Sequence, residues 1–426
     1  MNMSLDSPPG SLVLRSSCYS HVISPHSLAD VCDSCLSSPN IFDNLPPVTL
    51  YRCSKCKLSY YCNITCQRKA WPEHSKECKY LKKIQPKVPP AIVRLILRTC
   101  LKHREHPQIC ENLPDGSVRS FKDLKMHKED ISSSIEKKEA FSSFLQVIKA
   151  CVGDMFSADM LFETYCKILI NSTEITDCMG NTVGTGLYLG LSVVDHSCTP
   201  NVNCVFTGTA VELRSLDDIP APVLANTRVS YNNNILPTKL RQARLEQDYY
   251  FLCSCNLCCD KEGDLVCAGA VVCSGCQGPV AEIEGHCGIC GRINDVDVSK
   301  EKGIFFNTLE DDDVLRTYKV LSKKIHVYDY KMIEFSERTM SVCLAQENYE
   351  KFYQIGQSVL SAYKRYFPKN STSVGLHLAK LAKTAIYLNK TEEAISYLNQ
   401  SFHIFKLSHG EDSKLYQYLG ALRETI

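Results

Sequence analysis

The sequence predicts an α+β protein built from several domains, and three kinds of pattern support that prediction. Apolar and polar residues alternate in 9–24 and 202–213, as they do in half-buried strands. Apolar residues at helical spacing dominate 86–170 and the region after residue 312. Between these segments lie cysteine clusters with the spacing of zinc ligands. The length of 426 residues accommodates about three domains of ordinary size.

The composition is typical of a globular protein. The hydrophobic content is 44%, and 48 Lys and Arg against 47 Asp and Glu give a net charge of +1. No overall charge draws the chain to nucleic acid or membranes, so we expect weak or no nucleic-acid binding and no membrane association. Residues 1–9 lack the basic and apolar parts of a signal peptide. We therefore expect a monomer inside the cell, in the cytoplasm and the nucleus.

The 25 cysteines need an explanation that holds inside the cell, where the reducing environment disfavours disulfides. Fifteen of them fall in pairs or clusters at ligand-like spacing, which zinc binding explains. The other ten are scattered, and we expect them to be small buried apolar side chains.

The first cluster combines three cysteine pairs with a His-x3-Cys pair. Its eight ligands suit two tetrahedral zinc sites with none left over, although spacing alone leaves the pairing open: Cys32, Cys35, Cys53, Cys56, Cys62, Cys66, His74 and Cys78. Such closed sites stabilise a small domain that has little core of its own. Tyr60, Tyr61 and Trp71 either form a peptide-binding surface or pack around the zinc sites.

The centre of the chain joins a glycine-rich strand to a compact polar motif. Gly184, Gly186 and Gly190 permit close approach of other backbone segments. The polar motif follows as Asp195-His196-Ser197-Cys198-Thr199-Pro200-Asn201. After the hairpin at 202–213, we expect a short strand over 228–231 and a helix over 236–251.

Two further cysteine clusters lie downstream. Cys253-x-Cys255-x2-Cys258 offers three zinc ligands, and a fourth must come from Cys198, Cys259 or Cys267. A separate ribbon-like site consists of Cys273-x2-Cys276 and Cys287-x2-Cys290. Beyond the ribbon, apolar residues in 378–385 and 394–405 indicate two helices of a degenerate tetratricopeptide-like pair.

Together these motifs resemble the SET-and-MYND (Smyd) family of protein-lysine methyltransferases, from about residue 9 to the end. The resemblance rests on the first zinc cluster with Gln67-Arg68-Lys69-Ala70-Trp71, on Gly184-Thr185-Gly186-Leu187-Tyr188 and on the polar motif. It implies a split SET β-fold, interrupted by the finger and a helical segment. The implied domains are an N-terminal remnant of the SET strand region (1–31), a MYND-type zinc finger (32–78), a helical insert (79–170), the SET core (171–251), a post-SET zinc site with a zinc ribbon (252–295) and a tetratricopeptide-like helical domain (296–426).

The resemblance also implies which ligands share a metal. In the finger it implies a cross-braced arrangement, with Cys32, Cys35, Cys62 and Cys66 on one zinc and Cys53, Cys56, His74 and Cys78 on the other. It makes Cys198 the fourth ligand of the post-SET zinc, with Cys253, Cys255 and Cys258. With the ribbon site of Cys273, Cys276, Cys287 and Cys290, we expect about four zinc ions per chain.

The reaction implied by the resemblance is methyl transfer from S-adenosylmethionine to a lysine of a histone or another protein. Tyr231 matches the catalytic tyrosine, and the positions that match the donor site are Ser192, Asp195, His196, Asn171 and Phe251. Because the amine must arrive neutral and in line, an aromatic channel that desolvates lysine does most of the work. The finger implies a groove for a proline-rich peptide.

Three departures from the family pattern bear on catalysis. Asp195 stands where the family has asparagine, Ala225-Asn226-Thr227-Arg228 replaces a Gly-Glu-Glu-Leu-like segment, and no Gly-x-Gly segment precedes Pro9-Gly10. Either part of the donor site is missing or the chain as given starts after that segment. Two hypotheses follow. The protein is an active methyltransferase, or it is a catalytically weakened scaffold, a co-regulator that binds partners through its finger and helical tail.

Overall fold

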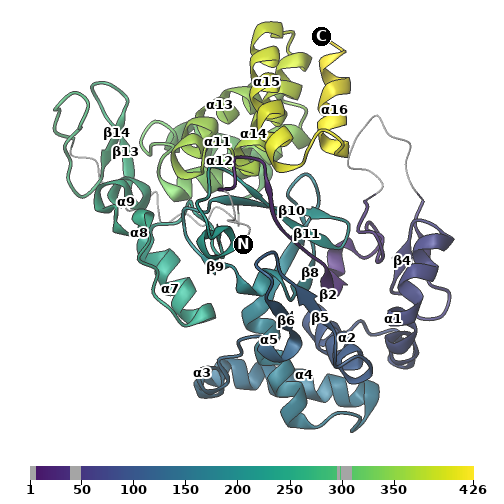
Figure 1. Cartoon of the computed structure of the whole chain (residues 1–426). Helices are drawn as coiled ribbons and strands as arrows, with labels where there is room; N and C mark the ends of the chain where they lie inside the picture. Colours follow the sequence, from purple (N-terminus) through teal and green to yellow (C-terminus); the bar gives the residue numbers. More distant parts are fainter. Residues whose placement is uncertain (1–5, 39–48, 295–297, 299–308) are drawn as a thin grey trace. The chain divides into compact units, whose positions relative to one another are not determined.

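The computed structural model contains both helices and strands, as the sequence predicts, and describes residues 6–38, 49–294, 298 and 309–426 (Figure 1). The chain forms two compact units. The first comprises Met1–Asp195, Val202–Thr227 and Asp248–Tyr250, and the second comprises His196–Asn201, Arg228–Gln247 and Phe251–Ile426. The expected boundary at 295–296 lies outside the described residues. Within the described ranges, no helix has the length and apolar character needed to cross a membrane.

The first unit contains two three-stranded antiparallel sheets. Their orders are β1-β11-β10 and β2-β8-β7. The strands are β1 (Leu12–Ser16), β2 (Cys18–Ile23), β7 (Ser172–Thr176), β8 (Thr182–Tyr188), β10 (Val202–Thr207) and β11 (Ala210–Ser215). The strands predicted at 9–24 and 202–213 are confirmed. Because β2, which ends at Ile23, shares a sheet with β7 and β8, which begin at Ser172, residues 24–171 form an insertion between strands of one sheet.

The glycines of β8 are required by the sheet itself. A Cβ on Gly184 would lie 2.4 Å from the carbonyl oxygen of Val22 in β2. A Cβ on Gly186 would lie 2.8 Å from the ring of Tyr188. The expected close approach of another backbone segment is confirmed at Gly184, whereas Gly186 and Gly190 make room for side chains.

The inserted segment begins with the finger and continues as helices. Its elements are β3 (Tyr51–Arg52), β4 (Tyr60–Tyr61), α1 (Ile64–Lys83), α2 (Ala91–Glu105), β5 (Cys110–Asn112), β6 (Val118–Ser120), α3 (Lys128–Ser133), α4 (Ile135–Val152) and α5 (Ala158–Asn171). Ile96 of α2, Ile148 of α4 and Ile168 of α5 are fully buried in one core cluster. The β5–β6 hairpin differs from the helical insert that the sequence predicts. Its two short strands are joined by a turn at Gly116, where φ is +86°.

Short elements complete the two units. They are the 3-10 helices η1 (Pro25–Ser27), η2 (Phe121–Asp123) and η3 (Leu191–Val193), with α6 (Val223–Asn226), β9 (Asp195–His196), β12 (Arg228–Val229), α7 (Thr238–Tyr249), α8 (Asn256–Cys259), α9 (Lys261–Ala268), β13 (Ala270–Val272) and β14 (Pro279–Ala281). The strand predicted over 228–231 ends at Val229, where β12 pairs with β9. The helix predicted over 236–251 is α7.

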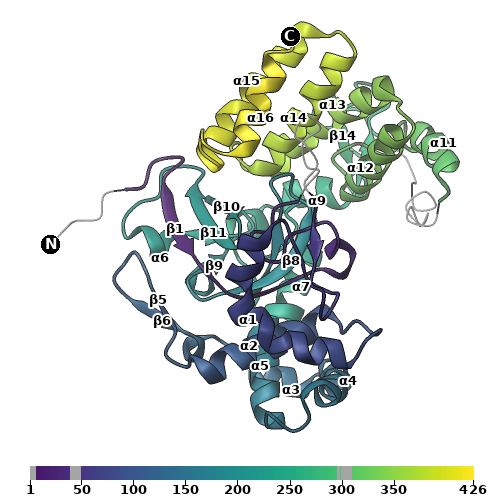
Figure 2. The same cartoon turned by 90° about the vertical axis from the view of Figure 1, so that its right-hand side faces the viewer.

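The tail is helical, as predicted, and consecutive helices pack on one another (Figure 2). They are α11 (Asp311–Leu321), α12 (Tyr330–Ala345), α13 (Tyr349–Tyr366), α14 (Thr372–Tyr387), α15 (Thr391–Ser408) and α16 (Lys414–Arg423). Side chains of Asp329, Asn348 and Ser371 cap the N-termini of α12, α13 and α14. Asn389, with φ of 57°, turns the chain between α14 and α15 at the predicted junction.

Candidate functional site

The structure gathers four groups of cysteine and histidine side chains, and in each group the potential ligand atoms lie within 4.8 Å of one another. The groups are Cys32, Cys35, Cys62 and Cys66; Cys53, Cys56, His74 and Cys78; Cys198, Cys253, Cys255 and Cys258; and Cys273, Cys276, Cys287 and Cys290. Four sulfurs bound to zinc at about 2.3 Å lie about 3.8 Å apart in a tetrahedron. The sulfur separations of 3.5 Å and 3.6 Å in the ribbon are close to that value.

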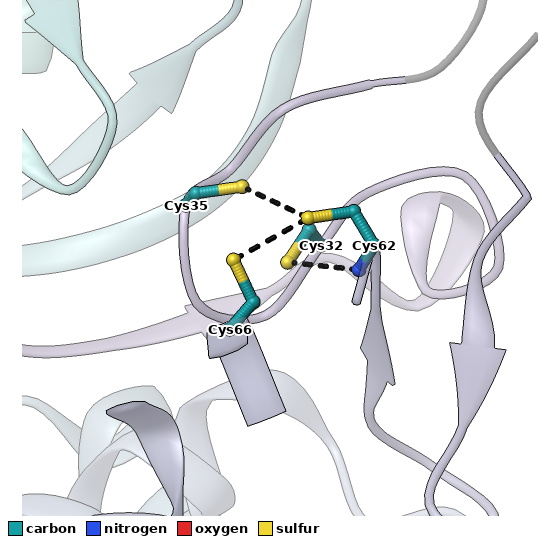
Figure 3. A group of neighbouring side chains, drawn as sticks. All are labelled: Cys32, Cys35, Cys62 and Cys66. Carbon is teal, nitrogen blue, oxygen red and sulfur yellow. Dashed lines mark hydrogen bonds between the residues drawn. The ribbon is translucent and has the colours of Figure 1, made fainter. Parts of the chain in front are cut away.

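In the first finger group, Cys32 and Cys35 lie in the loop that follows β2, Cys62 directly follows β4, and Cys66 lies in the first turn of α1 (Figure 3). The Cys62 sulfur lies 3.7 Å from that of Cys35 and 3.3 Å from that of Cys66. The amide of Cys62 donates to the Cys32 sulfur at 3.4 Å. The four sulfurs face a common point, so this group fits a zinc ion without rearrangement of the backbone.

The second finger group contains the histidine. Nε2 of His74 lies 3.5 Å from the Cys56 sulfur, and the sulfurs of Cys53 and Cys78 are 3.8 Å apart. Nδ1 of His74 lies on the opposite side of the ring, 3.3 Å from Oγ of Ser59. A zinc-binding histidine usually uses one nitrogen for the metal and donates the other N–H to an oxygen. His74 therefore has the geometry of an Nε2 ligand.

A buried network of charged side chains lies next to Nδ1 of His74. Oε1 of Glu77 lies 3.7 Å from Nδ1 of His74 and accepts from Arg94 at 2.8 Å and from Arg98 at 2.5 Å. Arg98 also donates to Asp33 at 2.9 Å and to the carbonyl of His21 in β2 at 2.7 Å. Burial alone would raise the pKa of Glu77, but the two guanidinium groups hold it well below its ordinary value.

The two finger groups have the cross-braced membership that the resemblance implies, which spacing alone could not decide. The fourth member of the third group is Cys198, as expected. Cys259 and Cys267 lie outside that group, and their thiols donate to the carbonyls of Ser254 and Ile235. The rings of Tyr61 and Trp71 both pack near His74, with centroids 6.0 Å and 6.1 Å from it. Tyr61 is buried, whereas Trp71 keeps 44% of its surface exposed.

The third group, in the second unit, borders two nitrogen-bearing side chains. Nε2 of His196 lies 3.2 Å from the Cys198 sulfur, and Arg241 donates to the Cys258 sulfur at 3.6 Å. Nδ1 of His196 accepts from the amide of Tyr231 at 2.9 Å. Burial lowers the pKa of His196 to about 4, and the charge of Arg241 adds to that effect.

The structure brings three of the predicted site residues together in the second unit. The rings of His196 and Tyr231 have centroids 5.3 Å apart, and those of His196 and Phe251 have centroids 5.9 Å apart. Tyr231 keeps 36% of its surface exposed although it adjoins a buried group. His196 is half-buried and lies between the Tyr231 backbone and the Cys198 sulfur, so Tyr231 differs from a tyrosine packed wholly in a core.

The predicted donor residues of the first unit have different surroundings. Ser192 donates to the carbonyl of Leu189 at 2.6 Å and accepts from Arg119 at 3.1 Å. Asn171 donates to the carbonyls of Lys125 and Lys167, each at 2.7 Å, so its amide braces the end of α5. Asp195 is exposed. It forms no ion pair with any residue in the described part of the chain.

Sequence reasoning missed two residues of the β5–β6 hairpin that contact the segment around Ser192. Arg119 donates to Ser192, as noted above. Glu111 accepts from the amide of Gly190 at 2.8 Å and from Ser16 at 2.9 Å. Arg119 lies 73 positions from Ser192 and Glu111 lies 79 positions from Gly190, and neither belongs to a local motif, so no pattern in the sequence identifies them.

Comparison with known proteins agrees with this arrangement. A family model described as the MYND finger matches residues 32–78. Human "Histone-lysine N-methyltransferase SMYD3" is 28% identical over 427 residues, covering 98% of this chain and 92% of that protein. Danio rerio "N-lysine methyltransferase SMYD2-A" is 25% identical, covering 95% and 90%, and human "N-lysine methyltransferase SMYD2" is 24% identical, covering 98% and 93%. Over nearly its whole length, the chain is similar to these proteins named as SMYD lysine methyltransferases.

Proposed function

We propose that this protein is an S-adenosylmethionine-dependent protein-lysine N-methyltransferase with four zinc ions. The observation that carries the proposal is the position of Tyr231, which is partly exposed and held by His196 beside a group of four cysteines. The relatives named as lysine methyltransferases align over nearly the whole chain, and their alignments include this region. The substrate is a lysine of a histone or another protein.

The proposed fold is a SET domain split by the finger and by the helical insert. The strands β1 and β2 pair with β11 and β8, which come after the finger in the sequence. This pairing supports the proposal, because the finger is then inserted between strands of one region. We further propose the domain limits 1–31, 32–78, 79–170, 171–251, 252–295 and 296–426. The last of these is a tetratricopeptide-like helical domain.

The proposed zinc ligands are the sixteen residues of the four groups. Their charges suit the metal, because cysteine binds zinc as a thiolate and one member, His74, is a neutral imidazole ligand. Within the group of Cys198, burial raises the pKa of Cys258 to about 11, whereas hydrogen bonds from the backbone of Cys258 and Cys198 outweigh burial at Cys255 and lower its pKa to about 7. The zinc ions are structural, since each group supplies four protein ligands and leaves no open position.

In the proposed reaction, S-adenosylmethionine supplies a methyl group on a positively charged sulfur. The rings of Tyr231 and Phe251 exclude water from the lysine amine, which favours its neutral, nucleophilic form. The Tyr231 hydroxyl orients the amine, and the Tyr231–His196 bond fixes the start of the loop that carries this hydroxyl. Ser192, Asp195 and His196 are the proposed donor-binding residues. The contacts of Asn171 favour a bracing role for that residue over donor contact.

A scaffold without catalysis is the second candidate, and one observation favours it. Asp195 is an exposed carboxylate with no ion-pair partner among the described residues, at a position where the family has asparagine. If it faces the carboxylate of the donor, the two charges repel. In either case, the exposed Trp71 supports a peptide-binding role for the finger, and proline-rich segments are the proposed partners. We propose a monomer of the cytoplasm and nucleus.

Calorimetric titration with S-adenosylhomocysteine separates the two candidates. The enzyme should bind this product, and a Tyr231→Phe variant should bind it about as well, because that hydroxyl acts on the amine. A scaffold should give no heat at high micromolar ligand. The matched control is parent protein stripped of zinc, which should lose binding in the enzyme case because the metal groups hold the site together.

A further inference from the structure

The buried guanidinium of Arg241 lacks a carboxylate partner. The side chain is 2% exposed, and no Asp or Glu in the described ranges forms an ion pair with it. Its nitrogens donate to the carbonyls of Leu236 and Leu257, to Oγ1 of Thr238 at 2.7 Å and to the Cys258 sulfur at 3.6 Å. A buried cation without a counter-charge is costly, so a negative charge must lie nearby in the folded protein.

The cysteine group beside Arg241 supplies that charge only when it holds a metal. Four neutral thiols carry no charge, whereas four thiolates around one divalent zinc ion carry a net charge of −2. Arg241 then faces an anion through Cys258, and the positive charge is balanced. The ribbon group differs, because the donors to its Cys273 sulfur are the neutral amides of Gly275 and Asn294.

His196 is the second donor to the same group. Since the backbone amide of Tyr231 can only donate, Nδ1 of His196 must be the acceptor and therefore carries no hydrogen. In the neutral imidazole the hydrogen then lies on Nε2, which is 3.2 Å from the Cys198 sulfur. His196 thus donates to a sulfur on one side and accepts from the Tyr231 backbone on the other.

We infer that His196 is a positioning residue which ties Tyr231 to a metal-bound Cys198, and that Arg241 balances the charge of the same site. The metal fixes the Cys198 thiolate, the thiolate orients the imidazole, and the imidazole fixes the amide of Tyr231. Loss of the metal would thereby loosen Tyr231 even where the fold survives. This inference rests on the proposed function in two respects: it treats Tyr231 as the reactive residue and the Cys198 group as a zinc site.

Two conservative substitutions separate the two hydrogen bonds of His196. His196→Asn places an amide oxygen near the position of Nδ1 and keeps an acceptor for Tyr231, but it is too short to reach Cys198. His196→Gln reaches toward Cys198 with an amide N–H and loses the acceptor near Tyr231. His196→Ala removes both bonds. Full-length protein loaded with ¹¹³Cd in place of zinc provides one NMR signal per metal, and Cys198→Ser identifies the signal of this site.

The expected result is a crossed pattern. His196→Asn moves the Cys198-linked ¹¹³Cd signal and leaves the other cadmium signals in place, whereas His196→Gln leaves all of them near their parent positions. The amide hydrogen exchange rate of Tyr231 follows the opposite pattern. It increases at least about tenfold in the His196→Gln and His196→Ala variants and is unchanged in the His196→Asn variant. If both variants change both readouts equally, or neither readout responds to His196, the link does not exist. Neither readout requires methyl transfer, so an inactive enzyme would not obscure the result.

Arg241 is tested by zinc competition with a chelator. Arg241→Met should lower the zinc affinity of this site by about 10- to 100-fold, the usual effect of losing a residue that supports a metal ligand. Arg244→Met is the matched control, because Arg244 lies on the same helix with an exposed side chain. If Arg241→Met binds zinc as tightly as the Arg244 variant, Arg241 does not balance the charge of the site.

Discussion

Nη2 of Arg98 in α2 lies 2.5 Å from Oε1 of Glu77 in α1, and the Glu77 side chain is fully buried. Through the same nitrogen, Arg98 reaches Asp33, which lies between Cys32 and Cys35 of the other finger group. One guanidinium therefore connects both metal groups of the finger to each other and to the carbonyl of His21 in β2. The finger is thus joined to the body of the first unit by buried charge as well as by the chain.

Glu77→Gln should open the finger. It leaves Arg94 and Arg98 without their shared counter-charge, and removing one partner of a buried ion pair typically costs about 3–5 kcal/mol. Hydrogen exchange of α1 measures this as a local opening free energy. Glu73→Gln is the control, because its bond to Lys102 lies at the surface and should contribute about 0–1 kcal/mol. Equal exchange in the two variants would mean that the buried network contributes nothing.

Protein purified without added metal should contain about four zinc ions per chain, because each of the four groups provides a closed set of ligands. Elemental analysis measures the ratio. Two or fewer would show that the groups outside the finger do not bind zinc, and three would leave one of them, the ribbon or the Cys198 group, empty.

Cys198→Ser should remove one zinc and lower the melting temperature, since it takes one ligand from a buried group. Cys259→Ser should change neither property, because Cys259 is exposed and outside the group although it follows Cys258 directly. Metal content and thermal unfolding of both variants test this. Full zinc content in the Cys198 variant would contradict the ligand assignment.

Asp195→Asn should strengthen donor binding. The substitution replaces a carboxylate by a neutral amide, which removes the repulsion between Asp195 and the carboxylate of the donor. Because Asp195 is exposed, we expect the affinity for the donor to rise by only about two- to fivefold. The gain should shrink at high salt, which screens the repulsion. Calorimetry with S-adenosylhomocysteine measures both effects. Weaker binding by the Asn variant would show that Asp195 instead pairs with the donor ammonium.

The sequence predicted those features that local spacing determines. The cysteine clusters, the paired strands at 12–23 and 202–215 and the tail helices follow from local spacing, whereas the membership of the finger groups and the place of Cys198 do not. The residues that hold the groups in place could not be found in this way. Arg98, Arg241 and Glu111 are single charged residues with distant partners, and a lone charge in a sequence looks the same whether it is solvated or buried. The β5–β6 hairpin escaped prediction because its three-residue strands are too short to show alternation.

Methyl transfer itself remains the most direct test. Parent protein and Tyr231→Phe are incubated with isotopically labelled S-adenosylmethionine and a lysine-rich protein mixture that contains histones, and labelled methyl-lysine is measured by mass spectrometry. We expect methyl-lysine with the parent and at least about a hundredfold less with Tyr231→Phe, whose zinc content and melting temperature should match the parent. Equal labelling by the two proteins, or none by a parent that binds S-adenosylhomocysteine, would contradict the assignment of Tyr231 as the reactive residue of a lysine methyltransferase.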